Sequence, residues 1–451
     1  MKFQYLLLIL LFVSCAQLPE RRTDKLSILQ GITSIKEVEF SVVADKNKIL
    51  RFELRTSEGK ILKPEEIKIV SRPFSEYVIH KMVFVRDSKV LYNLVVYEGE
   101  KVVDQRLIGQ GQLESQHLRL AIASCMDDNF PKKFKIWDEV AKRKPEYLLM
   151  IGDNVYADKG VGGLNKKLIV DEELLWKRYV DIRLSLPVYF MEKLIPVHGL
   201  WDDHDYGANN SGADYPHKEQ SREVFDAFFA QSLSDDEFFK GFGVGGLLSL
   251  GDFNLYFLDA RTFRDSDPDG THIGIDQYKW LMSKLEEEPN PSLIIKGDQF
   301  FGGYHEFDSF EKKHPREFGK FSDDLKKTNT PFIFISGDRH MSEIMQFPRS
   351  LFGRPSFEIT SSPIHGKTYP DSRDTNPWRV VAEKARVNFT ILDNLAKDNH
   401  WFMEVENIGE DGETHYRREL AVFIKDLQNN LNEVRKKRSG RRRYRRSGRR
   451  R

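Results

Sequence analysis

Five apolar runs of the sequence are each followed at once by side chains that can bind a metal or transfer a proton. They are Leu118–Ala123 before Ser124-Cys125, Tyr147–Ile151 before Gly152-Asp153, Leu194–Leu200 before Trp201-Asp202-Asp203-His204-Asp205, Leu255–Leu258 before Asp259-Ala260-Arg261, and Phe332–Ile335 before Ser336-Gly337-Asp338-Arg339-His340. Buried charges are costly unless they are paired or bind a metal. These positions therefore predict a functional site.

The types of donor atom predict a centre with two metal ions. Candidate donors are the thiol of Cys125, the carboxylates of Asp153, Asp203 and Asp338, the phenol of Tyr156, the imidazoles of His204 and His340, and the amides of Asn209 and Asn210. One tetrahedral zinc cannot use so many. Thiolate and phenolate suit a redox-type metal such as iron, whereas carboxylate and amide oxygens suit calcium or manganese. Two metals about 4 Å apart are a recurring clamp for a phosphoryl group.

The segments that must position these residues predict an α/β fold. Strand-like runs alternate with amphipathic helical stretches at Phe134–Arg143, Glu172–Leu184 and Asp276–Glu287. Ligands of open α/β sheets bind outside the carboxyl ends of the strands, so the five polar segments are expected to meet in one crevice. Tyr416–Leu427 is expected to form a final strand or helix.

A β-rich segment precedes this body. Alternation with a period of two at Val38–Val43 and Leu50–Leu54, followed by strand-like runs at Met82–Val85 and Leu91–Tyr97, predicts a small β-sandwich over residues 27–116. The segment contains no catalytic cluster, so we expect it to be structural or to shape the substrate site.

Six motifs occur in order between Leu118 and Leu427. They are Ala123-Ser124-Cys125, Gly152-Asp153-Asn154-Val155-Tyr156, Trp201-Asp202-Asp203-His204-Asp205-Tyr206-Gly207-Ala208-Asn209-Asn210, Asp259-Ala260-Arg261-Thr262-Phe263-Arg264, Ser336-Gly337-Asp338-Arg339-His340-Met341-Ser342 and Thr360-Ser361-Ser362. Together they resemble the alkaline phosphatase D (PhoD-like) family of calcineurin-like metallophosphoesterases. The resemblance implies a four-layer αββα sandwich over residues 117–432, preceded by the β-sandwich, and a metal-dependent phosphoric ester hydrolase.

The resemblance also implies a ligand set. A ferric ion (Fe3+) would be bound by Cys125, Asp153, Tyr156 and Asp338, and Asp153 would be shared with a calcium ion (Ca2+). Asp203 matches a metal-binding asparagine of the wider superfamily. The calcium-site asparagine is expected at Asn209 rather than Asn210. His340 matches a histidine that is either a ligand or a substrate contact.

The implied reaction is hydrolysis of a phosphate mono- or diester. The metals would lower the pKa of a bound water, and the resulting hydroxide would attack phosphorus. His204 matches the catalytic histidine, which orients the phosphate or protonates the leaving alkoxide. Arg261 and Arg264 are candidate phosphate contacts, because guanidinium matches phosphate bidentately. Met126 replaces a polar residue of many members, which leaves the substrate preference open.

Other polar and aromatic residues have ordinary explanations. We expect Asp202 to orient a ligand, and His198 to be a core histidine, because it lies within an apolar run. His365 is equally consistent with lining the site or not. Surface histidines are expected at His217, His272, His305 and His314, core tryptophans at Trp176 and Trp280, and a flexible turn at Gly241–Gly246.

The charge of the chain is distributed unevenly. The net charge is +1, but the last 17 residues, Arg435–Arg451, carry 12 Lys or Arg and no acid, which leaves 58 basic and 69 acidic residues elsewhere. An acidic body argues against a protein built around nucleic acid. The basic tail, residues 433–451, is expected to be either solvated or docked on an anionic surface.

The N-terminus predicts an export signal. One Lys precedes the apolar run Tyr5–Val13, which is too short to span a bilayer. Phe12-Val13-Ser14-Cys15 resembles a bacterial lipobox, so residues 1–26 are expected to be a signal and tether lipidated at Cys15, which would place the protein in the periplasm or anchor it in the outer membrane. An ordinary signal peptide is the alternative.

Two alternative functions remain open. The resembled family includes phospholipase D-like phosphodiesterases, which the motifs do not separate from monoesterases. A lipid-anchored surface protein that binds its partner through the basic tail, without catalysis, is the alternative from another class.

Overall fold

The computed structural model describes residues 25–423, except for residues 112–116, 129–133, 161–162, 165–169, 232–241, 252, 306, 371–374 and 398–399. The predicted lipidation site Cys15, the basic tail and the last residues of the segment expected at Tyr416–Leu427 lie outside the described residues.

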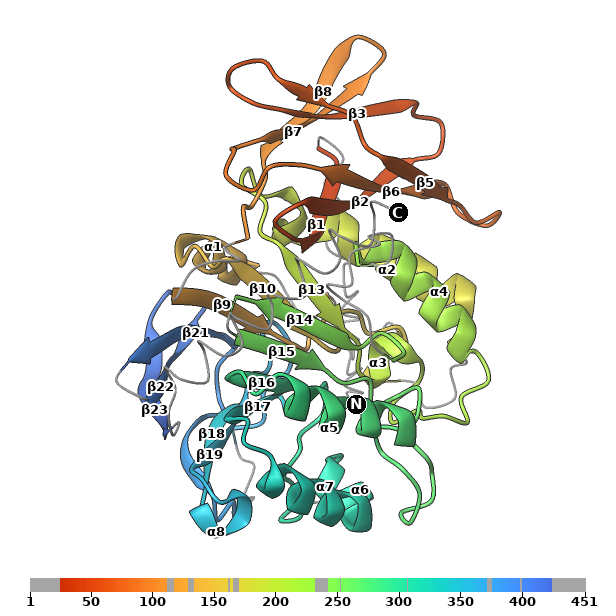
Figure 1. The fold of residues 1–451 in the computed structure, drawn as a ribbon. Helices are drawn as coiled ribbons and strands as arrows, with labels where there is room; N and C mark the ends of the chain where they lie inside the picture. The colour runs from red at the N-terminus through yellow and green to blue at the C-terminus, as the bar shows by residue number, and fades with distance from the viewer. Residues whose placement is uncertain are drawn as a thin grey trace, which may run out of the picture.

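Two antiparallel four-stranded sheets form the N-terminal part, at the top of Figure 1. In spatial order, one contains β1 (Ser27–Thr33), β2 (Glu37–Asp45), β6 (Tyr77–Val85) and β5 (Glu66–Val70), and the other contains β4 (Ile61–Leu62), β3 (Leu50–Arg55), β7 (Asn93–Glu98) and β8 (Lys101–Leu107). Alternate residues such as Val38, Phe40 and Phe52 are buried in one apolar cluster between the sheets. The period-two pattern therefore places one face of each sheet inward.

Two larger mixed sheets form the body. The six-stranded sheet contains, in order, β13 (Val197–Leu200), β10 (Tyr147–Ile151), β9 (His117–Ala123), β21 (Asn388–Lys397), β22 (His400–Gly409) and β23 (Thr414–Phe423). The seven-stranded sheet contains β14 (Gly246–Leu250), β15 (Phe253–Phe257), β16 (Ser292–Ile295), β17 (Phe332–Ser336), β19 (Ser356–Thr360), β18 (Ser342–Phe347) and β20 (Arg379–Glu383). The segment expected at Tyr416–Leu427 is thus a strand, β23.

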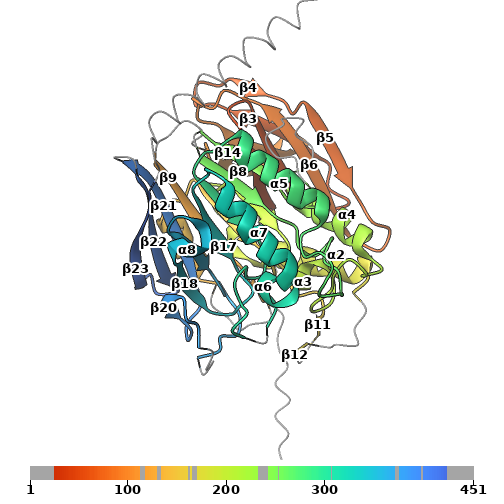
Figure 2. The same cartoon turned by 60° about the horizontal axis from the view of Figure 1, so that its bottom comes forward.

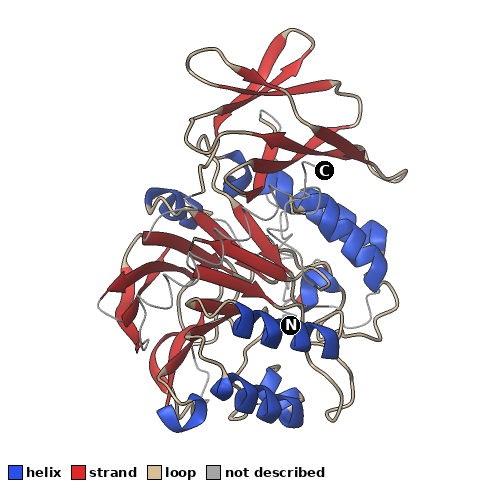
Figure 3. Ribbon diagram, in the orientation of Figure 1, coloured by secondary structure: helices blue, strands red, loops and turns tan. Residues whose placement is uncertain are grey.

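Helices cover the outer faces of these sheets (Figure 3). The longer helices are α1 (Ile136–Lys142), α2 (Glu172–Ser185) and α4 (Lys218–Phe228) on one side, and α5 (Ile275–Glu287) and α7 (Pro315–Lys327) on the other (Figure 1). Figure 2 shows α5 and α7 side by side. Short elements are β11 (Lys159–Gly160), β12 (Gly163–Leu164), the 3-10 helix η1 (Pro187–Phe190), α3 (Asp203–Tyr206), α6 (Phe310–Lys313) and α8 (Arg349–Phe352).

Alternation along the buried strands explains the layers. On the seven-stranded sheet, Leu255, Leu293 and Ile333 belong to the core shared with the six-stranded sheet. Their neighbours Tyr256 and Ile294 belong to the core under α5 and α7. Strands buried on both faces are continuous apolar runs, as seen in the sequence. The predicted α/β class and its four-layer arrangement are therefore confirmed.

Buried arginines join the N-terminal sheets to the body. The Arg183 guanidinium of α2 donates to the Phe228 carbonyl at 2.7 Å and to the Ser41 carbonyl of β2 at 2.9 Å. Arg106 of β8 donates to the Tyr189 carbonyl at 2.7 Å. These contacts attach the first sheets firmly to the helical side of the body. Within the described residues, no helix is both long and apolar enough to cross a membrane.

Burial of His198 predicts an acid-sensitive fold. His198 lies on β13 between Tyr147 and Phe257, at ring-centroid distances of 5.8 and 5.9 Å. Burial lowers its pKa to about 3 from 6.5. Below pH 6.5, His198 is therefore protonated in the unfolded chain but stays neutral in the folded chain. The free energy of unfolding decreases as the pH falls below 6.5.

We expect His198→Phe to remove this loss. Between pH 7.5 and pH 5, His198 should cost the wild type about 2 kcal/mol of unfolding free energy. Urea unfolding at the two pH values should show a smaller loss for the variant by that amount. Equal losses for both proteins would contradict the assignment.

Candidate metal centre

Loops at the carboxyl ends of β9, β10, β13 and β17 bring the predicted donor groups together. Three groups of side chains have ligand atoms within 4.8 Å of one another: Cys125, Asp153 and His340; Asp153, Asp203 and His204; and Asp202, Asp203 and Asp338. Asp153 and Asp203 each belong to two groups, so the groups form one cluster. The structure thus gathers residues that lie far apart in the sequence. Their roles as ligands stay a prediction.

The backbone of these loops adopts an uncommon conformation. Among the described non-glycine residues, positive φ values occur at six positions, and four of these are cluster residues: Cys125 (57°), Asp153 (51°), Asp338 (63°) and His340 (52°). Left-handed backbone is unfavourable for residues with a Cβ, and such strain gathers at functional sites. With these turns, the four side chains belong to one connected cluster of donor groups.

One end of the cluster contains the thiol and the phenol. Cys125 Sγ lies 3.5 Å from Asp153 Oδ2, and the Tyr156 hydroxyl donates to the same oxygen at 3.0 Å. His340 Nε2 lies 3.2 Å from the Tyr156 hydroxyl, and the Ser362 hydroxyl donates to Cys125 Sγ at 3.1 Å. Sulfur, phenol, carboxyl and imidazole donors therefore share one buried space.

The other end contains carboxylates. Asp202, Asp203 and Asp338 approach one another, and the backbone N–H of Asn210 donates to Asp203 Oδ2 at 2.7 Å. The side chains of Asn209 and Asn210 are exposed beside this end. The choice of Asn209 as an oxygen donor therefore stays a prediction.

His204 is held by an aspartate that the motifs did not identify. Its Nδ1 lies 2.7 Å from Asp158 Oδ1, and the Tyr156 ring packs on it at 4.3 Å. Burial opposes protonation of His204, but the charges of Asp203 and Asp153 outweigh it, so its pKa is raised well above the usual value. Asp158 lies in the same loop as Asp153, five residues on, and that proximity is the signal that could have found it.

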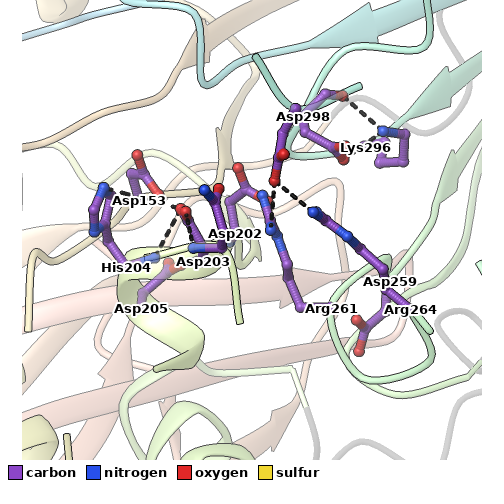
Figure 4. A network of polar contacts seen from close by, with 12 residues as sticks. Asp153, Asp202, Asp203, His204, Asp205, Asp259, Arg261, Arg264, Lys296 and Asp298 are labelled. Atoms are coloured by element: carbon purple, nitrogen blue, oxygen red, sulfur yellow. Dashed lines mark hydrogen bonds and ion pairs between the residues drawn. The ribbon is translucent and has the colours of Figure 1, made fainter. Parts of the chain in front are cut away.

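Buried charges continue beside the carboxylates (Figure 4). Arg261 Nε donates to Asp202 Oδ1 at 2.5 Å, and its Nη1 lies 3.3 Å from Asp308 Oδ2. Arg264 donates to the same Asp308 oxygen at 2.6 Å. Arg261 is only 1% exposed, and its Nη2 has no hydrogen-bond partner among the described residues. Its predicted contact with phosphate stays a prediction.

A second buried network lies beyond β16. Lys296 donates to Asp298 Oδ1, and Asp298 Oδ2 lies 3.0 Å from His272 Nε2. His272 Nδ1 lies 3.0 Å from His314 Nδ1. Lys296 and Asp298 follow the apolar run of β16, the same signal that marked the other strand ends.

Three predictions of surface histidines are wrong. His272, His305 and His314 are buried, because each has a polar partner inside the body: Asp298, Gln299 and the Asp265 carbonyl. His217 is half-buried. The expected burial of His198 and Trp176 is confirmed, whereas Trp280 is only partly buried. His365 is buried, its backbone pairs with that of Met126, and its Nδ1 lies 3.2 Å from the Asp127 carbonyl.

The electrostatics of the cluster fit bound cations. Burial raises the pKa of Asp153 well above its usual value, and it does the same to the Cys125 thiol, which the charges of Asp153 and Asp338 raise further. Asp153 Oδ1 is buried without a hydrogen-bond partner among the described residues. Cations would reverse these shifts, because they stabilise the ionised ligands. The mixed thiol, phenol and carboxyl set matches metal-ligand chemistry.

Gly152 lets Asp202 approach the cluster. Its φ is +107°, and a Cβ added there would lie 2.7 Å from the Asp202 Cβ. The combination of a left-handed backbone and a close neighbour requires glycine at this position.

We expect Gly152→Ala to destabilise the fold by about 2 kcal/mol or more, through strain and overpacking. Gly59→Ala is the matched control, since Gly59 has φ +85° and nothing within 4 Å of an added Cβ. Urea unfolding of both variants measures the difference. A Gly152→Ala loss no larger than that of the control would show that Asp202 is not tightly held.

Comparisons with known proteins bear on the family and the fold. The family model described as PhoD-like phosphatase matches residues 120–394. A solved structure of PhoD has a TM-score of 0.67 and 13% sequence identity, covering 87% of this chain and 91% of the PhoD chain. No curated protein matches the chain. At this identity the structural likeness supports the fold alone, but the family match spans more than half of the sequence. The chain therefore belongs to the PhoD-like phosphatase family and is a phosphoesterase hydrolase.

Proposed function

We propose that the protein is an exported enzyme that hydrolyses phosphate mono- or diesters with the help of two cations. The sharing of Asp153 between two groups of donors carries this proposal. A dinuclear centre needs one carboxylate placed between two sites. Among the residues that the structure describes, Asp153 alone contacts both Cys125 and Tyr156 and also groups with Asp203.

The donor atoms differ between the two sites, and this supports two different metals. Cys125, Tyr156, Asp153 and His340 would hold ferric iron, because thiolate and phenolate are suitable ligands for a redox-type ion. Asp338 groups with Asp202 and Asp203, but its charge also acts on the Cys125 thiol, so it would complete the iron site from the carboxylate end. Asp153, Asp203 and the Asn209 amide offer oxygen atoms and would hold calcium. Bound cations would supply positive charge to the phosphate oxygens and lower the pKa of water.

The residues of the chain itself handle the proton and the phosphate. His204 lies beside Asp153 and Asp203 and is placed to orient the phosphate or to donate a proton to the leaving oxygen. Asp158 fixes the orientation of the imidazole by accepting from Nδ1, which leaves Nε2 for the substrate. Arg261 places a permanent positive charge beside Asp202 and stabilises the crowded carboxylates.

We expect the purified protein loaded with iron and calcium to hydrolyse para-nitrophenyl phosphate, bis(para-nitrophenyl) phosphate, or both, and to show a visible thiolate-to-iron charge-transfer band. Cys125→Ser should shift the band and lower activity about 10- to 100-fold. The other cysteine supplies the control, since Cys15→Ser should change neither. Inactivity of the loaded wild type on both esters would refute the proposed function, and a colourless protein containing only zinc would refute the iron assignment.

We also propose that the chain is lipidated at Cys15 and lies in the periplasm or is anchored in the outer membrane. The short apolar run and the lipobox-like Phe12-Val13-Ser14-Cys15 support this. The basic tail would add an electrostatic contact with an anionic surface. In a bacterial host, Cys15→Ser should move the protein from the membrane fraction to the soluble fraction. The same comparison is made in a chain that lacks residues 435–451, so that the basic tail cannot hold the protein on the membrane. A Cys15→Ser variant that stays in the membrane fraction in that background would contradict the lipid anchor.

A further inference from the structure

Two exposed aromatic side chains adjoin the loop of Asp338 and His340. Phe307 is 58% exposed and Tyr369 is 45% exposed. Among the aromatic residues whose burial the structure describes, the other exposed one is Phe74, in the turn between β5 and β6 of the N-terminal part. Single exposed apolar side chains are common on protein surfaces, so a function for these two depends on where they lie and what they contact.

Each ring contacts a residue of that loop. The Arg339 guanidinium carbon lies 4.4 Å from the centroid of Phe307. The His340 ring lies 5.5 Å from that of Tyr369, with an angle of 64° between the planes. Because Arg339 and His340 directly follow Asp338, both rings stand at the edge of the candidate metal centre.

Each ring is also paired with a cation. Arg339 covers Phe307, and Lys367 Nζ lies 5.1 Å from the centroid of Tyr369. The Lys367 carbonyl accepts a hydrogen bond from His340 Nδ1, which ties this segment to the centre. Positive charge and exposed aromatic surface therefore occur together beside the place where phosphate would bind. Charge attracts the phosphate, and a ring attracts an organic group.

We propose that Phe307 and Tyr369 bind the organic group of the phosphate ester and give the enzyme a preference for a planar aromatic group. This inference rests on the proposed function and names its substrate class. A flat ring can stack on a single aromatic side chain, whereas a long acyl chain needs continuous apolar surface. The other exposed large apolar side chains lie on other elements, namely Ile49, Ile61, Ile67, Ile69, Phe74, Val85, Leu91, Val102, Ile275 and Val380.

The test compares diesters that release the same leaving group. Methyl para-nitrophenyl phosphate and phenyl para-nitrophenyl phosphate differ only in the group that stays on phosphorus. The metal-loaded wild type should prefer the phenyl ester in kcat/KM, and Phe307→Leu and Tyr369→Leu should each reduce that preference about two- to tenfold, mainly through KM. Phe74→Leu, remote from the centre, should leave it unchanged.

Two outcomes would overturn the inference. One is that Phe307→Leu and Tyr369→Leu both keep the full wild-type preference for the phenyl ester over the methyl ester. The other is a stronger preference for an octyl ester than for the phenyl ester, since that would indicate an acyl-chain substrate. If the wild type hydrolyses neither diester, para-nitrophenyl phosphate shows whether it is a monoesterase or whether the proposed function fails, and calorimetry with phenylphosphonate and methylphosphonate decides the inference separately. Tighter binding of phenylphosphonate that is lost in the two variants would support it, and equal binding would refute it.

Discussion

Several acidic groups occupy one buried space, and their mutual repulsion is the constraint on which the structure depends. Burial and the charges of Asp202 and Asp203 raise the pKa values of Asp153 and Asp338, so each of these two carboxyls resists ionisation. The fold offsets this partly with Arg261, which pairs with Asp202, and with the raised proton affinity of His204. Metal ions would complete the neutralisation, because they add charge where the protein donors converge. The buried polar cluster is therefore suited to bind cations.

The two large sheets hold these acidic side chains close together, because the loops that carry them are fixed to the ends of buried strands. Parallel strands buried on both faces end at a single edge, and left-handed turns at Cys125, Asp153 and Asp338 point their side chains inward. Such turns cost about 1 kcal/mol or more each, so packing on both sides must hold them. The N-terminal sheets contribute through Arg183 and Arg106, which tie them to the helical layer around η1 and α2. Loops carry the chemistry and the sheets fix their positions.

The parts of this arrangement that sequence predicts well are those with a local pattern. The run Tyr147–Ile151 coincides with β10, and the polar residues after β9, β13 and β17 converge as expected, because buried parallel strands leave a continuous apolar signature. Pairings between distant loops have no such signature. The contact of Asp158 with His204, and the burial of His272 against Asp298, depend on tertiary hydrogen bonds that no window of sequence contains. The polar loops around His272, His305 and His314 therefore predicted exposed side chains, whereas the structure buries them against polar partners.

The central claim is that Asp153 is shared by two cations, and counting bound metal tests it most directly. Native mass spectrometry with elemental analysis should find two metal ions per chain in the wild type. Asp153→Asn should lose both, whereas Asp128→Asn, at a buried acid paired with Arg178 instead, should keep both. Two metal ions retained in Asp153→Asn, or none in the wild type after loading, would contradict the account.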